Sequence, residues 1–279
     1  MLGRRKPLLT GFKVTDRCNL RCRACPFWKR SLPDMPWSRV VAVLDQLYRA
    51  GVRLLILEGG EPFLWRDGPH TLEDIVAAGK ERFFFTGIVT NGLLPIETAA
   101  DLVWVSIDGL RESHNDNRGP TFDRVIENLE ASHHPRLFAN VTINSRNWRE
   151  IPELVRFLAA RVKGITVQFY YPYEGTQDLC LSFPQRREVL ERLIALKREG
   201  YPLSDSIPVL KALRDNNWRC HPWLISSVEP DGRITFGCYL QNRADINCRQ
   251  CAFAAHAEIS MAYDYNPYTI ATGLQVFGL

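Results

Sequence analysis

Three cysteines near the start of the chain are spaced closely enough to bind one metal centre. Cys18, Cys22 and Cys25 lie in a short polar segment that ends at a proline. Three thiolates can ligate three irons of a 4Fe-4S cluster, which leaves the fourth iron without a protein ligand. By analogy with zinc enzymes, an open coordination position indicates a centre that binds a substrate or cosubstrate.

Two other interpretations of these cysteines remain open at this level. One is a zinc site with a distant fourth ligand, although zinc sites more often have two residues between paired cysteines. The other is a buried helical stripe, because positions 18, 22 and 25 follow helical periodicity. The intervening residues Asn19, Arg21 and Arg23 are polar, which argues against such a stripe.

A second set of polar residues follows the predicted strands. They are Gly59, Gly60, Glu61, Pro62, Asn91, Ser106, Asp108, Arg118 and Asn144. Paired glycines let the backbone approach a ligand closely. An arginine fork matches the geometry of a carboxylate. Parallel α/β folds place their ligand sites at the carboxyl ends of strands, so we expect these residues around one ligand. Asn-Gly and Asp-Gly are also ordinary turn sequences, and that alternative stays open.

We expect alternating strands and helices to position these residues. Short apolar runs predict strands at 11–16, 52–57, 83–89, 102–107, 137–143 and 165–170. Apolar residues at helical spacing predict helices at 38–48, 71–78, 121–131, 151–158 and 184–198. Such alternation predicts an α/β fold with a parallel sheet. Six units suit a partial (β/α)6 TIM-like barrel over residues 1–200, and an open doubly wound sheet is the competing arrangement.

Four more cysteines follow in a region where strands and helices no longer alternate. Cys220 and Cys238 flank a predicted hairpin with a Pro-Asp-Gly turn, and Cys248 and Cys251 form a C-x₂-C pair. Four thiolates can saturate a metal, and a structural zinc remains an alternative here. We expect residues 201–260 to form a small appended domain and residues 261–279 to be a tail without an assigned element.

The C-x₃-C-x₂-C spacing after a first strand resembles the signature of the radical S-adenosylmethionine (SAM) superfamily. The resemblance implies that Cys18, Cys22 and Cys25 hold a 4Fe-4S cluster that cleaves SAM to a 5′-deoxyadenosyl radical. It also implies that residues 59–62 bind the methionine amino group, that Arg118 binds the carboxylate and that Ser106 contacts the ribose. Asn91, Asp108 and Asn144 complete the expected SAM site. The residue before the third cysteine is usually aromatic in the family, whereas here it is Ala24.

The second cysteine set is similar to the Twitch auxiliary-cluster domain of some radical SAM enzymes. This resemblance implies a second 4Fe-4S cluster on Cys220, Cys238, Cys248 and Cys251. Such a cluster would accept an electron from a substrate radical and complete a two-electron oxidation of a small molecule. A one-electron donor such as ferredoxin or flavodoxin is implied as partner. Radical modification of peptides or lipids, with carbon–carbon or carbon–sulfur bond formation, is the alternative within the family.

Bulk properties narrow the class of protein. The sequence has 46% hydrophobic and 24% charged residues and a net charge of +4, which is ordinary for a globular protein. We expect no nucleic-acid partner, no transmembrane segment and, without a secretory signal, a cytoplasmic location. Cysteines in the cytosol are usually metal ligands or free thiols. A zinc-bearing protein without catalytic activity is the rival from another class.

The loop after the sixth predicted strand is expected to face the substrate. Its candidates are Glu174 as a base, Tyr171 for stacking or hydrogen bonding, and Cys180 as a hydrogen-atom donor. About ten residues precede the first predicted strand, so we expect no amino-terminal peptide-binding domain. This favours a small-molecule or lipid-like substrate.

Overall fold

A single curved sheet positions the site. The computed structural model describes residues 5–173, 175–251 and 253–278. The sheet has eight strands in the order β10-β9-β1-β2-β5-β6-β7-β8, and its neighbours are parallel except for the β9–β10 hairpin. The strands are β1 (Leu9–Lys13), β2 (Leu54–Glu58), β5 (Phe85–Thr90), β6 (Leu102–Ser106), β7 (Leu137–Ile143), β8 (Gly164–Phe169), β9 (Ile225–Val228) and β10 (Ile234–Phe236). A separate ladder joins β3 (Arg66–Asp67) to β4 (His70–Thr71).

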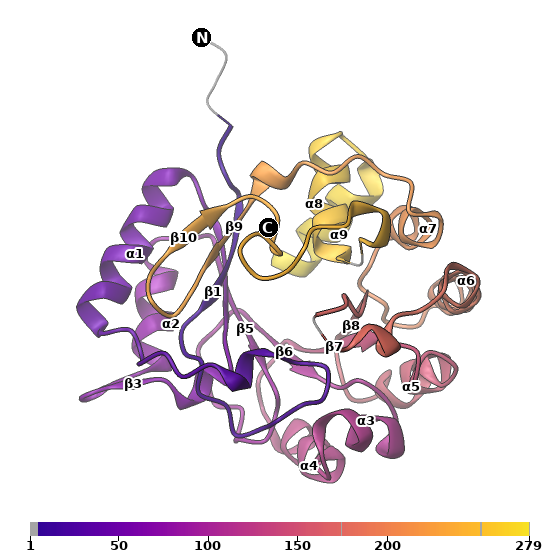
Figure 1. The fold of residues 1–279 in the computed structure, drawn as a ribbon, viewed down its shortest axis with the longest axis horizontal. Coiled ribbons are helices and arrows are strands. Elements are labelled where there is room, and N and C mark those ends of the chain that lie inside the picture. Colours follow the sequence, from indigo (N-terminus) through magenta and orange to yellow (C-terminus); the bar gives the residue numbers. More distant parts are fainter. Residues whose placement is uncertain (1–4, 174, 252, 279) are drawn as a thin grey trace.

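Helices cover the outside of this sheet (Figure 1). They are α1 (Trp37–Ala50), α2 (Leu72–Lys80), α3 (Arg111–Arg118), α4 (Phe122–Ala131), α5 (Ile151–Leu158) and α6 (Phe183–Arg198). Buried residues recur at helical spacing, as with Val40, Val43 and Leu47 of α1. Gly51 ends α1 with a φ of 115°, a left-handed conformation that glycine adopts without a steric penalty. Among the described residues, no helix has the length and apolarity that crossing a bilayer requires.

The predicted α/β class and partial barrel are confirmed by this topology. The first strand differs in its limits, because the predicted 11–16 becomes Leu9–Lys13. Side-chain hydrogen bonding explains its early end. The Thr15 hydroxyl donates to Asp34 Oδ1 at 2.5 Å and accepts from the Arg17 backbone N–H at 3.0 Å. These side-chain bonds hold the turn that leads into the cysteine segment, while backbone bonds from Gly60 and Glu61 still reach the carbonyls of Thr15 and Arg17.

Residues after 200 contain more regular structure than expected. They form α7 (Ile207–Asp215), the β9–β10 hairpin, α8 (Ala254–Tyr263) and α9 (Pro267–Phe277). The hairpin was predicted, but β9 also pairs in parallel with β1 and so extends the main sheet. The expected limit at residue 260 falls inside α8. The division into 1–200, 201–260 and 261–279 therefore stays a prediction.

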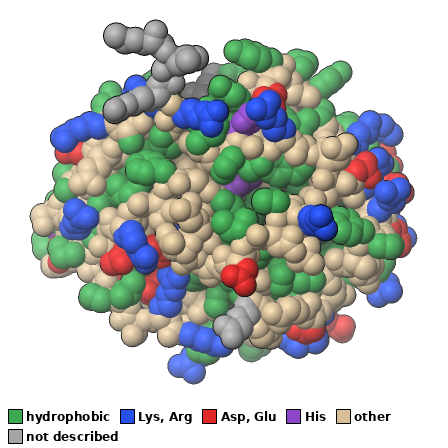
Figure 2. Space-filling view, turned by 45° about the horizontal axis from the view of Figure 1, so that its top comes forward, with side chains coloured by type: hydrophobic (Ala, Val, Ile, Leu, Met, Phe, Trp, Pro, Cys, Tyr) green, Lys and Arg blue, Asp and Glu red, His purple; other side chains and the backbone are tan. Residues whose placement is uncertain are grey.

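The carboxyl-terminal helices lie between the β9–β10 edge and α7 (Figure 1). Val276 and Phe277 of α9 pack with Leu54 and Phe85, the first residues of β2 and β5. The rings of Phe85 and Phe277 are 4.9 Å apart in an edge contact. Helix α9 thus closes the end of the barrel opposite the cysteines. Apolar side chains gather on the face that is turned forward in Figure 2, between scattered Lys and Arg side chains.

Candidate active site

One cavity brings most of the predicted site residues together. Its volume is about 710 Å³, within the usual range for small-molecule sites. It extends from the cysteine segment through the inside of the sheet to α8 and α9. The predicted residues in its lining are Cys18, Cys22, Cys25, Gly59, Gly60, Asn91, Ser106, Asp108, Arg118 and Tyr171. Outside its lining are Glu61, Pro62, Asn144, Cys180 and the four cysteines of the second set, Cys220, Cys238, Cys248 and Cys251.

The three cysteines lie in an irregular loop between β1 and the short 3₁₀ helix Phe27–Lys29. The alternative of one buried helical stripe is therefore wrong. The Cys25 N–H donates to the Cys22 carbonyl at 3.2 Å, and the Leu20 N–H contacts Cys18 Sγ at 3.4 Å. A neighbouring helix also holds the loop, since Asn117 Oδ1 accepts from the Ala24 N–H at 3.0 Å. The loop is thus positioned by its own backbone and by α3.

The chemistry of the three thiols suits a cationic centre. Burial raises the pKa of Cys18, and it raises the pKa of Cys22 to about 11. The neighbouring cysteines contribute to both shifts, which places the sulfurs near one another. A bound cation reverses such shifts because it stabilises thiolates. Within the described ranges, no three Cys, His, Asp or Glu side chains are arranged to hold a single metal ion.

The glycine pair brings the end of β2 against the backbone that leads into the cysteine loop. A Cβ atom on Gly59 would lie 2.5 Å from the Thr15 carbonyl oxygen, and one on Gly60 would lie 2.3 Å from the Arg17 carbonyl oxygen. The Gly60 N–H donates to the Thr15 carbonyl at 2.8 Å. Any side chain here would therefore displace the loop or fill the cavity that both glycines line.

Glu61 joins the ends of two strands. Its side chain is fully buried and accepts hydrogen bonds from Thr90 Oγ1 at 2.9 Å, the Asn91 N–H at 2.8 Å and the Phe63 N–H at 3.2 Å. Burial raises its pKa although these donors partly oppose the shift. Its carboxylate is thus engaged within the protein, and the sequence alone did not indicate this.

An ion pair on the cavity wall joins two of the predicted residues. Arg118 Nε lies 2.6 Å from Asp108 Oδ2, which also accepts from Asn117 Nδ2 at 2.7 Å. Burial of Asp108 disfavours its charge, but the Arg118 charge and these hydrogen bonds outweigh it and lower the pKa of Asp108. The ion pair uses the Nε atom of Arg118. The two terminal guanidinium nitrogens of Arg118 are therefore left for a carboxylate ligand.

The remaining SAM-site candidates divide into two groups. Ser106 ends β6 in the cavity lining, and Asn91 Nδ2 lies 2.7 Å from Asn19 Oδ1 and 3.9 Å from Cys18 Sγ. Asn144 is turned away from the cavity, and its Oδ1 accepts from the Arg146 N–H at 2.9 Å. Asn91 therefore contacts the cysteine loop, whereas Asn144 organises the loop after β7.

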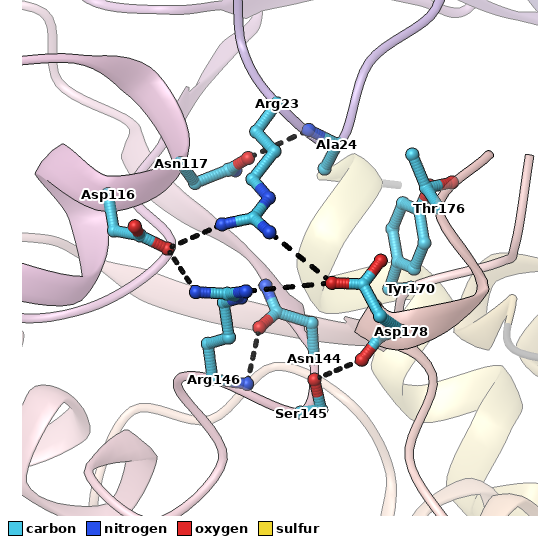
Figure 3. A network of polar contacts seen from close by, with 10 residues as sticks. All are labelled: Arg23, Ala24, Asp116, Asn117, Asn144, Ser145, Arg146, Tyr170, Thr176 and Asp178. Carbon is cyan, nitrogen blue, oxygen red and sulfur yellow. Dashed lines mark hydrogen bonds and ion pairs between the residues drawn. The ribbon is translucent and has the colours of Figure 1, made fainter.

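An ion-pair network joins the cysteine loop to the loops around it (Figure 3). Arg23 lies 3.6 Å from Asp116 and 3.4 Å from Asp178. Arg146 lies 3.4 Å and 3.6 Å from the same two carboxylates. All four side chains are 42–55% exposed, so each pair alone contributes little. Together they tie the cysteine loop to α3, to the loop after β7 and to the segment Gln177–Leu179.

The second cysteine set flanks the hairpin as predicted. Cys220 precedes the 3₁₀ turn Pro222–Leu224 and β9, and Cys238 follows β10. The turn Cys248–Gln250 carries the third cysteine, and Cys251 follows directly. Burial raises the pKa of Cys220 to about 12, and Cys251, Cys238 and Cys248 add to the shift. The four cysteines therefore lie near one another although 31 positions separate the first from the last.

The three catalytic candidates lie in different surroundings. Glu174 lies outside the described residues. The Tyr171 hydroxyl donates to the Asp245 carbonyl at 2.5 Å and accepts from the Asn247 N–H at 2.8 Å, so it holds the segment before Cys248. Cys180 follows the 3₁₀ turn Gln177–Leu179, outside the cavity lining, and burial raises its pKa.

Several cavity residues were missed by the sequence analysis. Lys13 Nζ, 3% exposed, lies 3.0 Å from Glu58 Oε1 and 2.7 Å from Tyr239 Oη. All three line the cavity, and Tyr239 is adjacent to Cys238. A charged residue in an apolar strand, as in Gly-Phe-Lys-Val, was the only sequence signal for Lys13. Its partners Glu58 and Tyr239 come from distant segments, and no sequence signal pointed to them.

The comparisons with known proteins agree with this geometry. A family model of the radical SAM superfamily matches residues 12–158, more than half of the chain. The chain therefore belongs to the radical SAM superfamily, a class of enzymes. The Fe-coproporphyrin III synthase of Methanosarcina barkeri is 27% identical over 221 residues, which is 71% of this chain and 54% of that protein. A GTP 3′,8-cyclase of Rhodopirellula baltica is 33% identical over 190 residues, 60% of this chain and 50% of that protein.

Solved structures share the fold over nearly the whole chain. Streptococcus suis SuiB bound to S-adenosylmethionine has a TM-score of 0.69 at 16% identity, covering 96% of this chain and 68% of that one. The protein anSMEcpe with bound AdoMet and a peptide has a TM-score of 0.65 at 19% identity, covering 94% and 81%. At such identities the likeness concerns the fold alone. The chain spans about half the length of the curated relatives that it matches.

Proposed function

We propose that this chain binds a 4Fe-4S cluster through Cys18, Cys22 and Cys25 and cleaves SAM reductively beside it. The observation that carries this proposal is the single cavity that the three cysteines share with the residues at the strand ends. Membership of the superfamily implies the same two cofactors. When bound, the cluster and SAM would supply a 5′-deoxyadenosyl radical that removes a hydrogen atom from a substrate.

The residues of the cavity wall would hold SAM by complementary chemistry. The free fork of Arg118 suits the methionine carboxylate, and Asp108 fixes the orientation of that fork. The Ser106 hydroxyl suits the ribose, and the backbone of Gly59 and Gly60 suits the methionine amino group. Glu61 and Pro62 contribute indirectly, since the Glu61 carboxylate fixes the Asn91 backbone.

Two aromatic residues compensate for Ala24 in this proposal. Ala24, Phe27 and Trp28 all line the cavity, and Trp28 Nε1 donates to the Cys22 carbonyl at 3.1 Å. Their rings would contact the adenine and exclude water from the reacting centre. Exclusion of water matters because a carbon radical must meet the substrate before any other hydrogen donor.

We also propose an auxiliary 4Fe-4S cluster on Cys220, Cys238, Cys248 and Cys251. The support is the mutual effect of these cysteines on the pKa of Cys220, together with their arrangement around the β9–β10 hairpin. Such a cluster would provide a one-electron acceptor near the cavity, because Tyr239 next to Cys238 lines it. Ferredoxin or flavodoxin would be the external electron donor.

The cavity favours a small-molecule or lipid-like substrate, because its lining is mostly apolar. A two-electron oxidation of that substrate is the reaction that we propose. Radical modification of a peptide or lipid, with carbon–carbon or carbon–sulfur bond formation, is the second candidate. It draws support from the fold shared with SuiB, which has been solved with a precursor peptide.

Anaerobic reconstitution with iron and sulfide tests the cluster assignment. We expect about eight irons per chain, and 5′-deoxyadenosine after dithionite and SAM are added. Replacement of Cys18, Cys22 and Cys25 with alanine should leave about four irons and abolish the product.

The matched control is Cys180→Ala, which removes a thiol outside the cavity lining. This variant should keep both the iron and the cleavage activity. Cleavage that survives the triple substitution would show that the ligands are assigned wrongly. Stoichiometric zinc without cleavage would support the rival zinc protein.

A further inference from the structure

The floor of the cavity, formed by Leu8, Ile270 and Leu274, is not covered by the rest of the described chain. These three side chains line the cavity and are 37%, 38% and 47% exposed. By contrast, Val276 of the same helix is 8% exposed, and Phe85, which packs with it, is fully buried. Covering large apolar side chains is favourable and protein interiors are closely packed, so an uncovered apolar floor requires an explanation.

Helix α9 is a single layer between this floor and the surface of the protein. Ile270, Gly273 and Leu274 line the cavity, whereas Ala271 and Gln275 are exposed and lie outside its lining. Residues three and four positions apart share one side of a helix. Ile270 and Leu274 therefore lie on the inner side of α9, and their exposed surface faces the cavity.

The cavity wall formed by β1 and β2 changes from apolar to charged along its length. Its lining residues form three cross-strand pairs, which are Leu9 with Leu54, Gly11 with Ile56 and Lys13 with Glu58. The first pair lies beside α9, because Leu54 packs with Val276 and Phe277. The last pair adjoins the segment that leads to the cysteine loop. Four residues of strand separate the two ends, which is about 13 Å.

The opposite side of the cavity is polar. Its lining residues on β7 and β8 are Asn140, Thr142, Thr166 and Gln168. Asp205 and Glu258 line the side of α7 and α8, where they accept hydrogen bonds from the Val167 and Ser206 backbone N–H groups. The apolar path through the cavity therefore follows β1, β2 and α9.

Open space remains on the inner side of α9. A Cβ atom on Gly273 would meet no other atom within 4 Å, although Gly273 lines the cavity. An apolar cavity binds apolar ligands in preference to water, because water finds no hydrogen-bond partners there. The space beside the floor thus suits a hydrocarbon group that enters from the side of the cysteines.

We infer that the floor and the adjoining ends of β1 and β2 bind the aliphatic chain of an amphiphilic substrate, whose polar end faces Lys13, Glu58 and the cysteine loop. The inference deepens the proposed function and rests on it, because it assigns the substrate class and its orientation in the same cavity. A hydrocarbon chain would cover the floor, and the polar end would keep hydrogen-bond partners at the charged pair.

A series of primary alcohols from 1-butanol to 1-decanol tests the floor without any radical chemistry. Calorimetry of the reconstituted protein with saturating SAM should show affinity that rises about 4-fold with each added methylene. The diol 1,8-octanediol should bind at least 10-fold more weakly than 1-octanol, because its second hydroxyl would be buried without a partner. Equal affinity across the series, or for octanol and the diol, would overturn the inference.

Substitution in α9 then locates the chain. Gly273→Phe places a ring in the open space and should weaken 1-decanol at least 10-fold while leaving 1-butanol unchanged. The matched control is Ala271→Phe, which adds the same ring on the exposed side of the helix and should change neither affinity. Equal decanol affinities for the two variants would refute the placement at the floor. If Gly273→Phe does not fold, Leu274→Gln takes its place with the same expectation.

The two proposals fail in distinguishable ways. Dependence on chain length that Gly273→Phe removes, without SAM cleavage by the unaltered protein, would keep the floor as a binding site and remove the proposed reaction. Cleavage of SAM without dependence on chain length would keep the reaction and remove the floor as a binding site.

Discussion

Asp108 and Arg118 form an ion pair on the cavity wall, which would orient Arg118 for the carboxylate ligand that we propose. Asp108 accepts from Arg118, from Asn117 and, through Oδ1, from the Thr142 N–H at 3.2 Å. These contacts fix the guanidinium before any ligand binds, so little side-chain entropy is lost on binding. The proximity of Asp108 also raises the pKa of Arg118 and keeps it charged despite its burial.

At this scale we predict that Arg118→Lys weakens SAM binding at least 10-fold. A lysine cannot make the bidentate contact to a carboxylate and cannot keep the pairing geometry with Asp108. Calorimetric titration of the reconstituted protein with SAM measures the effect. The control is Arg124→Lys on α4, 58% exposed, which should bind SAM normally. Equal affinities for both variants would remove Arg118 from the SAM site.

At the scale of elements, the end of β2 and the cysteine loop depend on each other. Gly60 N–H and Glu61 N–H donate to the carbonyls of Thr15 and Arg17, both at 2.8 Å. These bonds continue the β1–β2 pairing beyond its last ladder pair, Lys13 and Glu58. The cysteine loop is therefore positioned by Gly60 and Glu61, which follow closely after the end of β2 at Glu58.

We predict that Gly60→Ala destabilises the protein by at least about 2 kcal/mol and lowers the iron bound at the first site. The new Cβ would lie 2.3 Å from a backbone oxygen, which cannot move without the loop. Denaturant unfolding and iron analysis measure the two effects. Gly273→Ala in α9 is the control, since its Cβ meets nothing within 4 Å and alanine favours helix by roughly 1 kcal/mol. Similar behaviour of the two variants would contradict the packing argument.

At the scale of the whole molecule, buried titratable groups set the dependence of stability on pH. Glu258 has its pKa raised from 4.5 to about 8, so the folded state holds an extra proton between these values and stability falls as pH rises. His114 and His256 have theirs lowered from 6.5 to about 4, which makes stability rise with pH below 6.5. Of these three groups, only Glu258 still titrates between about pH 6.5 and 8.

We therefore predict that the free energy of unfolding falls by about 1 kcal/mol from pH 6.5 to 8 and that Glu258→Gln removes this fall. Glutamine has no proton to lose in this range. Denaturant titrations at several pH values measure the slope, with Glu188→Gln on α6, 48% exposed, as the matched variant. A slope that persists in Glu258→Gln would assign it to another group.

Patterns of neighbouring residues in the sequence were enough to predict most of the fold. The spacing of Cys18, Cys22 and Cys25 and the alternation of six strands with helices depend on neighbours along the chain. The sequence therefore predicted the α/β partial barrel and placed Ser106 at a strand end, where it lines the cavity. Arg118 was also expected at a strand end; it lines the cavity, but from the carboxyl end of helix α3. It was less informative for β9, whose Ile-Ser-Ser-Val has two serines although all four residues are buried.

Tertiary structure decided what each side chain contacts. It directed Glu61 to Thr90 and Asn91, closed the barrel with Phe277 and brought Asp205 near Glu258. Burial and charge at a site come from residues far apart in sequence, and no local pattern records them. The sequence by itself thus determined the class of fold and indicated which thiols we propose as cluster ligands. Only the folded chain determined which polar groups meet inside the cavity, because desolvation and electrostatic coupling exist only after packing.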